Sequence, residues 1–311
     1  MDLKALEELI LNINARTGIK SYILEKDYYV CCVLKELSIM QNDLYAYFKG
    51  GTAVYKILNQ MNRFSEDIDL TVKVNELESK NSNKTRLKKS ALGYSINGLE
   101  LIPIETIDKK GSITSFYKYD SLFKSNELFK PGMIQIESTS FTISEPVSTY
   151  VIEPLIYKYA SNAEKAILKD RFGISEFSID IIKLERIFVD KIFAAEFYFE
   201  RKMYEDVSKH IYDIVILMEN ESIKLLLSDI DYLRELINYK RQEELVRIGG
   251  IESSKKLNEF EYFKDMFNDE LVYAFNKMQR IYVLDNDYIL SIDDVKEYLL
   301  KLLNILKEYN L

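Results

Sequence analysis

The segment from Phe48 to Leu70 (FKGGTAVYKILNQMNRFSEDIDL) constrains the fold most strongly, because it places two glycines a short distance before two aspartates. The stretch Leu44 to Lys49 predicts a short strand that ends at Gly50-Gly51. Residues 53–59 predict a helix with Thr52 as its N-cap. The segment therefore predicts a strand, a glycine turn and a helix in succession.

A second strand is predicted over Asp67 to Val74 (DIDLTVKV), where polar and apolar residues alternate with period two. Residues two apart on a strand point to the same side, so Asp67 and Asp69 can face one point in space. Two carboxylates on one face repel each other unless a cation lies between them. Hard oxygen ligands of this kind suit Mg²⁺, which usually shares its coordination shell with substrate phosphates.

The glycine turn adds a place for the phosphates. Gly50 and Gly51 allow the backbone to approach a phosphate closely, and Thr52 with the following helix N-terminus supplies N–H and hydroxyl donors. Lys56, one turn into the helix, can reach the same anion. A triphosphate on the turn and metal ions on the carboxylates are what phosphoryl or nucleotidyl transfer requires.

The rest of the chain predicts an α/β protein in two parts. Its 311 residues include only 10 Gly and 4 Pro, which favours a helix-rich protein. The first 40 residues predict two helices, and residues 94–143 hold several short strands, most clearly Met133 to Glu137 after Pro131-Gly132. Long helical patterns follow, so we expect a mixed-sheet core over residues 1–150 and a helical domain over residues 151–311.

The chain is acidic, with a formal net charge of −8, which excludes a basic footprint for nucleic acid over the whole chain. A local basic patch remains compatible with this charge. Residues 76–90 carry five cations without an intervening acid from the first to the last: Lys80, Lys84, Arg86, Lys88 and Lys89. This stretch predicts either a phosphate or RNA contact or a solvated helix face.

Several features predict a cytosolic protein. Cys31 and Cys32 are adjacent, which fits neither a disulfide nor a zinc site and indicates reduced thiols. The N-terminus resembles an amphipathic helix and no signal peptide. No apolar run approaches the roughly 18 residues that would cross a membrane.

A second group of residues stands in the helical half. On a helix over residues 184–195, Lys191 shares a face with apolar side chains, and burial of an ammonium without a partner is costly. Lys191 is therefore either a lysine that extends to the surface or a functional residue. His210 is the single histidine of the chain, so we assign it no catalytic role.

The motifs together resemble the AbiEii/AbiGii toxin family, which comprises nucleotidyltransferase-fold toxins of type IV toxin–antitoxin and abortive-infection systems. The F-K-G-G-T and R-F-S-E-D-I-D-L sequences around Asp67 are similar to the family's signature. Glu25-Lys26-Asp27-Tyr28 resembles its E-K-D-Y-W segment, with Tyr29 where Trp is usual. The resemblance covers residues 20 to 217.

The resemblance extends the predicted site. It implies that Glu137 is the third metal-binding carboxylate, and Glu137 is indeed the one acid on its predicted strand face, which it shares with Gln135. It adds Ser65 to the nucleotide-binding residues. E-R-I-F-V-D-K-I resembles a family segment in which Lys191 matches the functional lysine. K-H-I-Y-D-I resembles one in which Asp213 orients Lys191 or acts as a base, with an ordinary aspartate on the helix surface as the alternative.

The function implied is that of a bacterial, Mg²⁺-dependent nucleotidyltransferase toxin. Asp67, Asp69 and Glu137 would hold two Mg²⁺ ions around a nucleoside triphosphate, with RNA, particularly the tRNA 3′ end, as acceptor. A protein acceptor and a nucleotide-binding regulator without turnover are the alternatives. The family also implies an antitoxin partner encoded nearby.

Overall fold

The computed structural model describes residues 2–60, 62–124 and 132–311 and divides the chain into two compact units. The sheet unit holds the chain up to Gln60 and then Ser65–Ile181. The helical unit holds the short segment that ends at Phe64 and then Ile182–Leu311.

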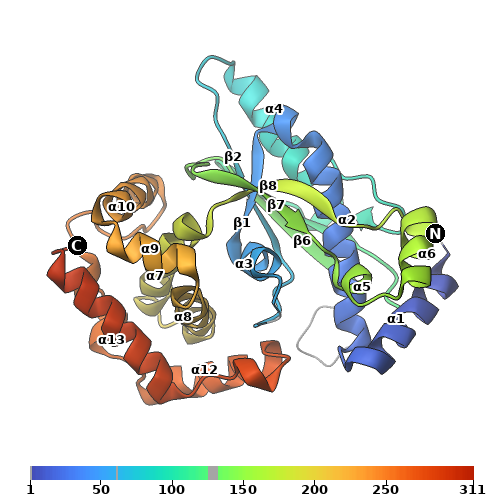
Figure 1. Ribbon diagram of the computed structural model, residues 1–311. Helices are drawn as coiled ribbons and strands as arrows, with labels where there is room; N and C mark the ends of the chain where they lie inside the picture. The colour runs from blue at the N-terminus through green and yellow to red at the C-terminus, as the bar shows by residue number, and fades with distance from the viewer. Residues whose placement is uncertain (1, 61, 125–131) are drawn as a thin grey trace. The chain divides into compact units, whose positions relative to one another are not determined.

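The sheet unit begins with the two expected helices and continues with strands and further helices, among them β3 to β7 with no α-helix between them in the residues that the structure describes (Figure 1). Its elements are α1 (Leu3–Thr17), α2 (Ser21–Leu44), β1 (Ala46–Lys49), α3 (Gly50–Leu58), β2 (Ile68–Val72), α4 (Lys80–Leu92), β3 (Glu100–Leu101), β4 (Ile107–Lys109), β5 (Ser112–Lys118), β6 (Met133–Thr139), β7 (Val147–Ile152), α5 (Leu155–Lys158), α6 (Asn162–Phe172) and β8 (Phe177–Ile182). The strands predicted around Asp69 and Glu137 are confirmed as β2 and β6. The predicted turn residue Pro131 lies outside the described residues.

The strands form one mixed sheet in the order β3-β5-β6-β2-β1-β8-β7, with β4 paired to β5. β2 is antiparallel to β1 and parallel to β6, whereas β5 and β6 are antiparallel. The α/β class with a mixed sheet is therefore confirmed.

The two faces of the sheet differ. On one face Ile68, Leu70 and Ile136 are fully buried, and α4 packs against β2, β5 and β6. The hydroxyls of Ser115 and Tyr117 donate to the carbonyl oxygen of Ala91 in α4, which shows that odd-numbered β5 residues point to this helix. The opposite face carries half-buried residues of the same strands. We call it the half-exposed face.

The boundary between the units lies about thirty residues later than predicted, at Ile181–Ile182 instead of residue 150. The prediction was wrong because only helices were expected beyond residue 150, whereas β7 spans that position and β8 follows it. β8 (FSIDII) returns to the sheet and pairs in parallel with β1, with Phe48 opposite Ile181. The local sequence of β8 does not indicate that this strand pairs with one about 130 residues earlier.

The helical unit is built from seven α-helices among its described residues. They are α7 (Leu184–Phe199), α8 (Tyr204–Met218), α9 (Glu221–Ser228), α10 (Ile230–Val246), α11 (Glu261–Lys264), α12 (Asp269–Tyr282) and α13 (Ile292–Glu308). α7 and α8 pack closely together, and α12 and α13 pack on α8. Among the residues that the structure describes, no helix is long and apolar enough to cross a membrane.

Candidate nucleotidyltransferase site

The glycine turn joins β1 directly to α3. Gly50 has a φ of +86°, which side chains rarely tolerate, and a Cβ built there would lie 2.0 Å from Oδ2 of Asp69. The position therefore requires glycine for two reasons: its backbone conformation, and the space that the side chain of Asp69 occupies. The carboxylate of Asp69 lies against the first turn of α3, where backbone N–H groups attract negative charge.

The prediction that Thr52 caps the helix is wrong, because α3 begins two residues earlier, at Gly50, with Lys49 as N-cap. Thr52 is buried in the first turn instead. Its hydroxyl donates to the backbone carbonyl of Asp67 at 2.6 Å and is bonded to Oγ of Ser65 at 3.0 Å. Thr52 thus fixes the segment that leads into β2, and Ser65 is part of the same contact.

Asp69 and Glu137 stand next to each other on the half-exposed face. They are paired in register on the parallel strands β2 and β6, so their side chains leave the sheet on the same side. Thr114 of β5 is paired with Glu137 and extends this row. Both acids are partly exposed to solvent. The structure therefore brings together two of the three predicted metal-binding carboxylates.

Asp67 is placed differently. It is exposed and lies one residue before β2, which begins at Ile68. Within the described part of the chain, no group of three or more His, Cys, Asp and Glu side chains is arranged to hold a metal ion. The pair formed by Asp69 and Glu137 still fits Mg²⁺ chemically, because this ion commonly uses one or two carboxylates and completes its shell with water and phosphate oxygens.

Lys49 is a neighbour that the sequence reasoning did not single out. It is the antiparallel partner of Asp69 on β1, so one row across the sheet contains Lys49, Asp69 and Glu137. Its place in the F-K-G-G-T motif was the available signal. A cation beside two carboxylates reduces their mutual repulsion and offers a donor to a phosphate.

The E-K-D segment of α2 contacts residues next to the strands that carry the predicted site. Glu25 is buried and accepts hydrogen bonds from Oγ of Ser121 at 2.8 Å and the backbone N–H of Leu122 at 2.7 Å. Lys26 forms an ion pair with Glu66 at 3.0 Å and donates to the carbonyl oxygen of Met133. Lys26 therefore holds the residue before Asp67 and the first residue of β6.

Lys56 has a different partner from the phosphate that the sequence predicted. Its side chain is buried, and its ammonium is paired with Asp27 and lies 3.0 Å from Sγ of Cys31. Asp27 also accepts from the hydroxyl of Tyr55 and from the backbone N–H of Leu155. Lys56 and Asp27 thus form a buried pair that joins α2 to α3 and α5, and we do not carry Lys56 into the reaction.

The helical unit contains a second cluster of charges. Nζ of Lys191 lies 2.7 Å from Oδ2 of Asp213, and both side chains are buried. Arg63 adds two hydrogen bonds of 2.7 Å to the same carboxylate, through Nε and Nη2. The buried pair excludes the reading of Lys191 as a surface lysine. Arg63 was missed, although it stands in the R-F-S-E-D-I-D-L motif.

The charges of this cluster compensate one another. Burial raises the pKa of Asp213, but Arg63 and Lys191 outweigh it and hold the pKa well below its usual range. A carboxylate in this state is a weak base. The geometry therefore favours orientation of Lys191 over proton abstraction as the role of Asp213.

His210 packs beside this cluster. Its ring stacks on Tyr198 with a centroid separation of 5.3 Å. Burial, followed by the charge of Lys191, lowers the pKa of His210 well below its usual value, so the ring is neutral at pH 7.

Comparison with known proteins identifies the family of the chain. Residues 32–282 match the family described as "Nucleotidyl transferase AbiEii toxin, Type IV TA system". A search of curated proteins gives no match. Among solved structures, MenT4, a nucleotidyltransferase toxin from Mycobacterium tuberculosis H37Rv, is similar at 13% identity, with 95% of this chain and 98% of that chain covered and a TM-score of 0.39. Because the family match spans most of its length, the chain belongs to the AbiEii nucleotidyltransferase toxins of type IV toxin–antitoxin systems.

Proposed function

We propose that this nucleotidyltransferase transfers a nucleoside monophosphate from a nucleoside triphosphate to a hydroxyl of RNA, with the tRNA 3′ end as the acceptor. One observation carries the proposal. Asp69 and Glu137 are in register on the half-exposed face, and Asp69 lies against the glycine turn at the start of α3. Carboxylates for a metal ion and N–H groups for a phosphate thus meet at one place.

In this proposal Asp67, Asp69 and Glu137 bind Mg²⁺, and two ions are expected. When bound, Mg²⁺ neutralises charge on the triphosphate and on the leaving group. The N–H groups of Gly50 and Gly51 bind the phosphates, while Thr52 and Ser65 keep the Asp67 backbone in place. The acceptor oxygen bonds to the α-phosphorus, the bond to the bridging oxygen breaks, pyrophosphate leaves with the electron pair, and the hydroxyl proton passes to water.

We assign Lys191 to the stabilisation of negative charge during transfer and Asp213 to its orientation. Lys191→Met tests this assignment. Asp213 keeps both hydrogen bonds from Arg63 in this variant, so we expect the protein to fold. We expect the rate of nucleotide transfer to fall at least about 100-fold because the cation is lost. A folded variant with a rate near that of the wild type would remove Lys191 from the reaction.

Family membership also motivates two proposals about context. We propose that a cognate antitoxin, encoded by a neighbouring gene, counteracts the toxin. We further propose that it acts in the cytoplasm, where nucleoside triphosphates and tRNA are abundant. Co-expression with each neighbouring gene tests the first, because the antitoxin should restore growth.

The central experiment is incubation of the protein with total bacterial RNA, Mg²⁺ and each α-³²P nucleoside triphosphate in turn. We expect label in a tRNA-sized band, and none with the Asp67→Ala/Asp69→Ala variant. Label in protein bands alone would replace the RNA acceptor by a protein side chain. Equal labelling by the variant would show that the carboxylates are not the site.

A further inference from the structure

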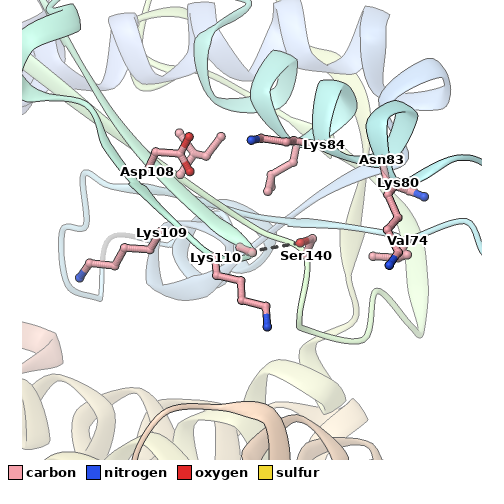
Figure 2. A pocket seen from close by; sticks show the side chains of 11 residues that line it. Val74, Lys80, Asn83, Lys84, Asp108, Lys109, Lys110 and Ser140 are labelled. Atoms are coloured by element: carbon pink, nitrogen blue, oxygen red, sulfur yellow. Dashed lines mark hydrogen bonds between the residues drawn. The ribbon is translucent and has the colours of Figure 1, made fainter.

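A pocket lined by lysines lies in the sheet unit, between α4 and the hairpin of β4 and β5 (Figure 2). It has a volume of about 360 Å³. Lys80 and Lys84 line it from α4, and Lys109 and Lys110 from the hairpin. We call it the lysine pocket. Val74, Leu87 and Ile113 add an apolar part to its lining.

Ordered elements hold the lysines in place. α4 begins at Lys80 after Ser79, whose side chain accepts from the N–H of Ser82 as an N-cap. Lys80 and Lys84 are four residues apart and therefore lie on one face of the helix. Gly111 gives the hairpin its turn with a φ of +79°, and its carbonyl accepts from the N–H of Ser140 at 2.8 Å. The hairpin tip is thus tied to the end of β6.

The charge of the lining is unbalanced. Its four lysines face a single acid among the described lining residues, Asp108. All four lysines are exposed, and none forms an ion pair within the described part of the chain. By contrast, Arg86 on the same helix is buried and paired with Glu78. A chain of net charge −8 therefore concentrates unpaired positive charge at one pocket.

The lysine pocket is separate from the carboxylates. Ile113 lines it and belongs to the odd-numbered β5 residues, which point to α4, whereas Thr114 is paired with Glu137 on the half-exposed face. Ser140, which also lines the pocket, follows Glu137 by three residues, or about 10 Å along the strand. The lysines are therefore placed for a ligand that extends beyond the two carboxylates.

We propose that the lysine pocket binds the phosphodiester backbone of the RNA acceptor, which rests on the RNA acceptor proposed above. Lysines act as point charges that attract phosphates without reading the base. A polyanion with regularly spaced phosphates can contact both walls of the pocket at once. The pocket then attracts the RNA backbone by charge.

The test compares two variants with the same change in charge. In the pocket variant Lys80, Lys84, Lys109 and Lys110 become Gln. In the control variant the exposed lysines Lys4, Lys20, Lys169 and Lys307, which lie outside the pocket, become Gln. Circular dichroism and thermal unfolding verify that both remain folded, which we expect because every altered side chain is exposed.

Binding of labelled tRNA is measured by fluorescence anisotropy from 50 to 200 mM salt, and the KM for the nucleoside triphosphate is measured in parallel. We expect the pocket variant to bind tRNA at least about 10-fold more weakly at 100 mM salt, with a salt slope smaller by roughly 3. The control variant should change by less than about twofold, because its lysines contact no phosphate. The KM for the triphosphate should remain unchanged in both.

Three results would overturn the proposal. Equal losses of tRNA affinity in both variants would show a general effect of net charge. A rise in the KM for the triphosphate with unchanged tRNA binding would assign the pocket to the nucleotide. A wild-type protein that neither binds nor labels RNA would refute the RNA acceptor itself, which is distinct from the first two results because there the wild type still labels RNA.

Discussion

Asp69 in the sheet unit and Asp213 in the helical unit are both aspartates that the sequence marks as functional, and the structure gives them different surroundings. Asp213 is buried and accepts from Arg63 and Lys191, so two cations of its own chain neutralise it. Asp69 is partly exposed and has a second carboxylate, Glu137, as its neighbour on β6. An acid neutralised inside the protein supports the fold, whereas two adjacent, partly exposed carboxylates suit the binding of a metal cation.

The largest expected effect is a loss of activity without a loss of stability when Asp69 or Glu137 is replaced. Asp69→Asn and Glu137→Gln each remove one carboxylate of the pair while they preserve its size. We expect each to lower the rate of nucleotide transfer at least about 100-fold and to change the free energy of unfolding by less than about 1 kcal/mol, because relief of repulsion offsets lost contacts. Initial rates with α-³²P nucleotides and urea unfolding measure the two quantities. A variant that loses stability but keeps its rate would make this pair structural.

Asp213→Ala, by contrast, should cause a large loss of stability. It leaves the buried cations Arg63 and Lys191 without their carboxylate, so we expect the free energy of unfolding to fall by about 3–5 kcal/mol. Urea unfolding at pH 7 measures the loss. Asp206→Ala, at a half-exposed position of the same helix, is the matched control and should be far milder. Equal stabilities for the two variants would contradict the comparison.

The pH dependence of stability should depend on the same cluster. The folded-state pKa of Asp213 is depressed, so its contribution is fully present above the unfolded pKa of about 4 and is lost as the pH falls through the folded value. The difference in unfolding free energy between wild type and Asp213→Asn should therefore shrink below about pH 4. Urea unfolding at pH 7, 5, 4 and 3 follows it. A difference that stays constant down to pH 3 would show that Asp213 is not stabilised as a carboxylate.

Local patterns carried the part of the site that the sequence could predict. Period-two alternation identified the strand around Asp69, and the two glycines identified the turn at Gly50, because strands and tight turns impose their requirements on adjacent residues. Glu137 was found through its own strand and the resemblance. The register that pairs it with Asp69 joins residues 68 positions apart, and only the structure shows it.

Ion pairs between residues far apart in the chain could not be predicted from the sequence. Arg63 and Asp213 are 150 positions apart, so no local pattern indicated that they share a buried ion pair. Lys56 was expected near a phosphate because it follows the glycine turn by one helical turn. Its direction is set by Asp27, which belongs to another helix. Long charged side chains can turn towards a partner on another element when they are buried beside it. The spacing of residues within one element does not indicate which partner that will be.

The smallest expected effect concerns an ion pair that has good geometry without full burial. Arg16 at the end of α1 donates to both oxygens of Glu164 in α6, at 3.1 and 2.7 Å, and this contact lowers the pKa of Glu164 to about 2. The Arg16 side chain remains 45% exposed, so water and salt screen the pair.

Arg16→Gln should therefore shift the urea midpoint far less than Asp213→Ala. The stabilisation by Glu164 is present above its unfolded pKa of about 4.3 and is lost as the pH falls towards 2, so the small difference should fade in that window. It should also diminish at high salt, whereas the effect of Asp213→Ala should persist because the buried cluster is screened much less. If Arg16→Gln proved as destabilising as Asp213→Ala, hydrogen-bond geometry and not burial would decide which charges this chain uses to hold its fold.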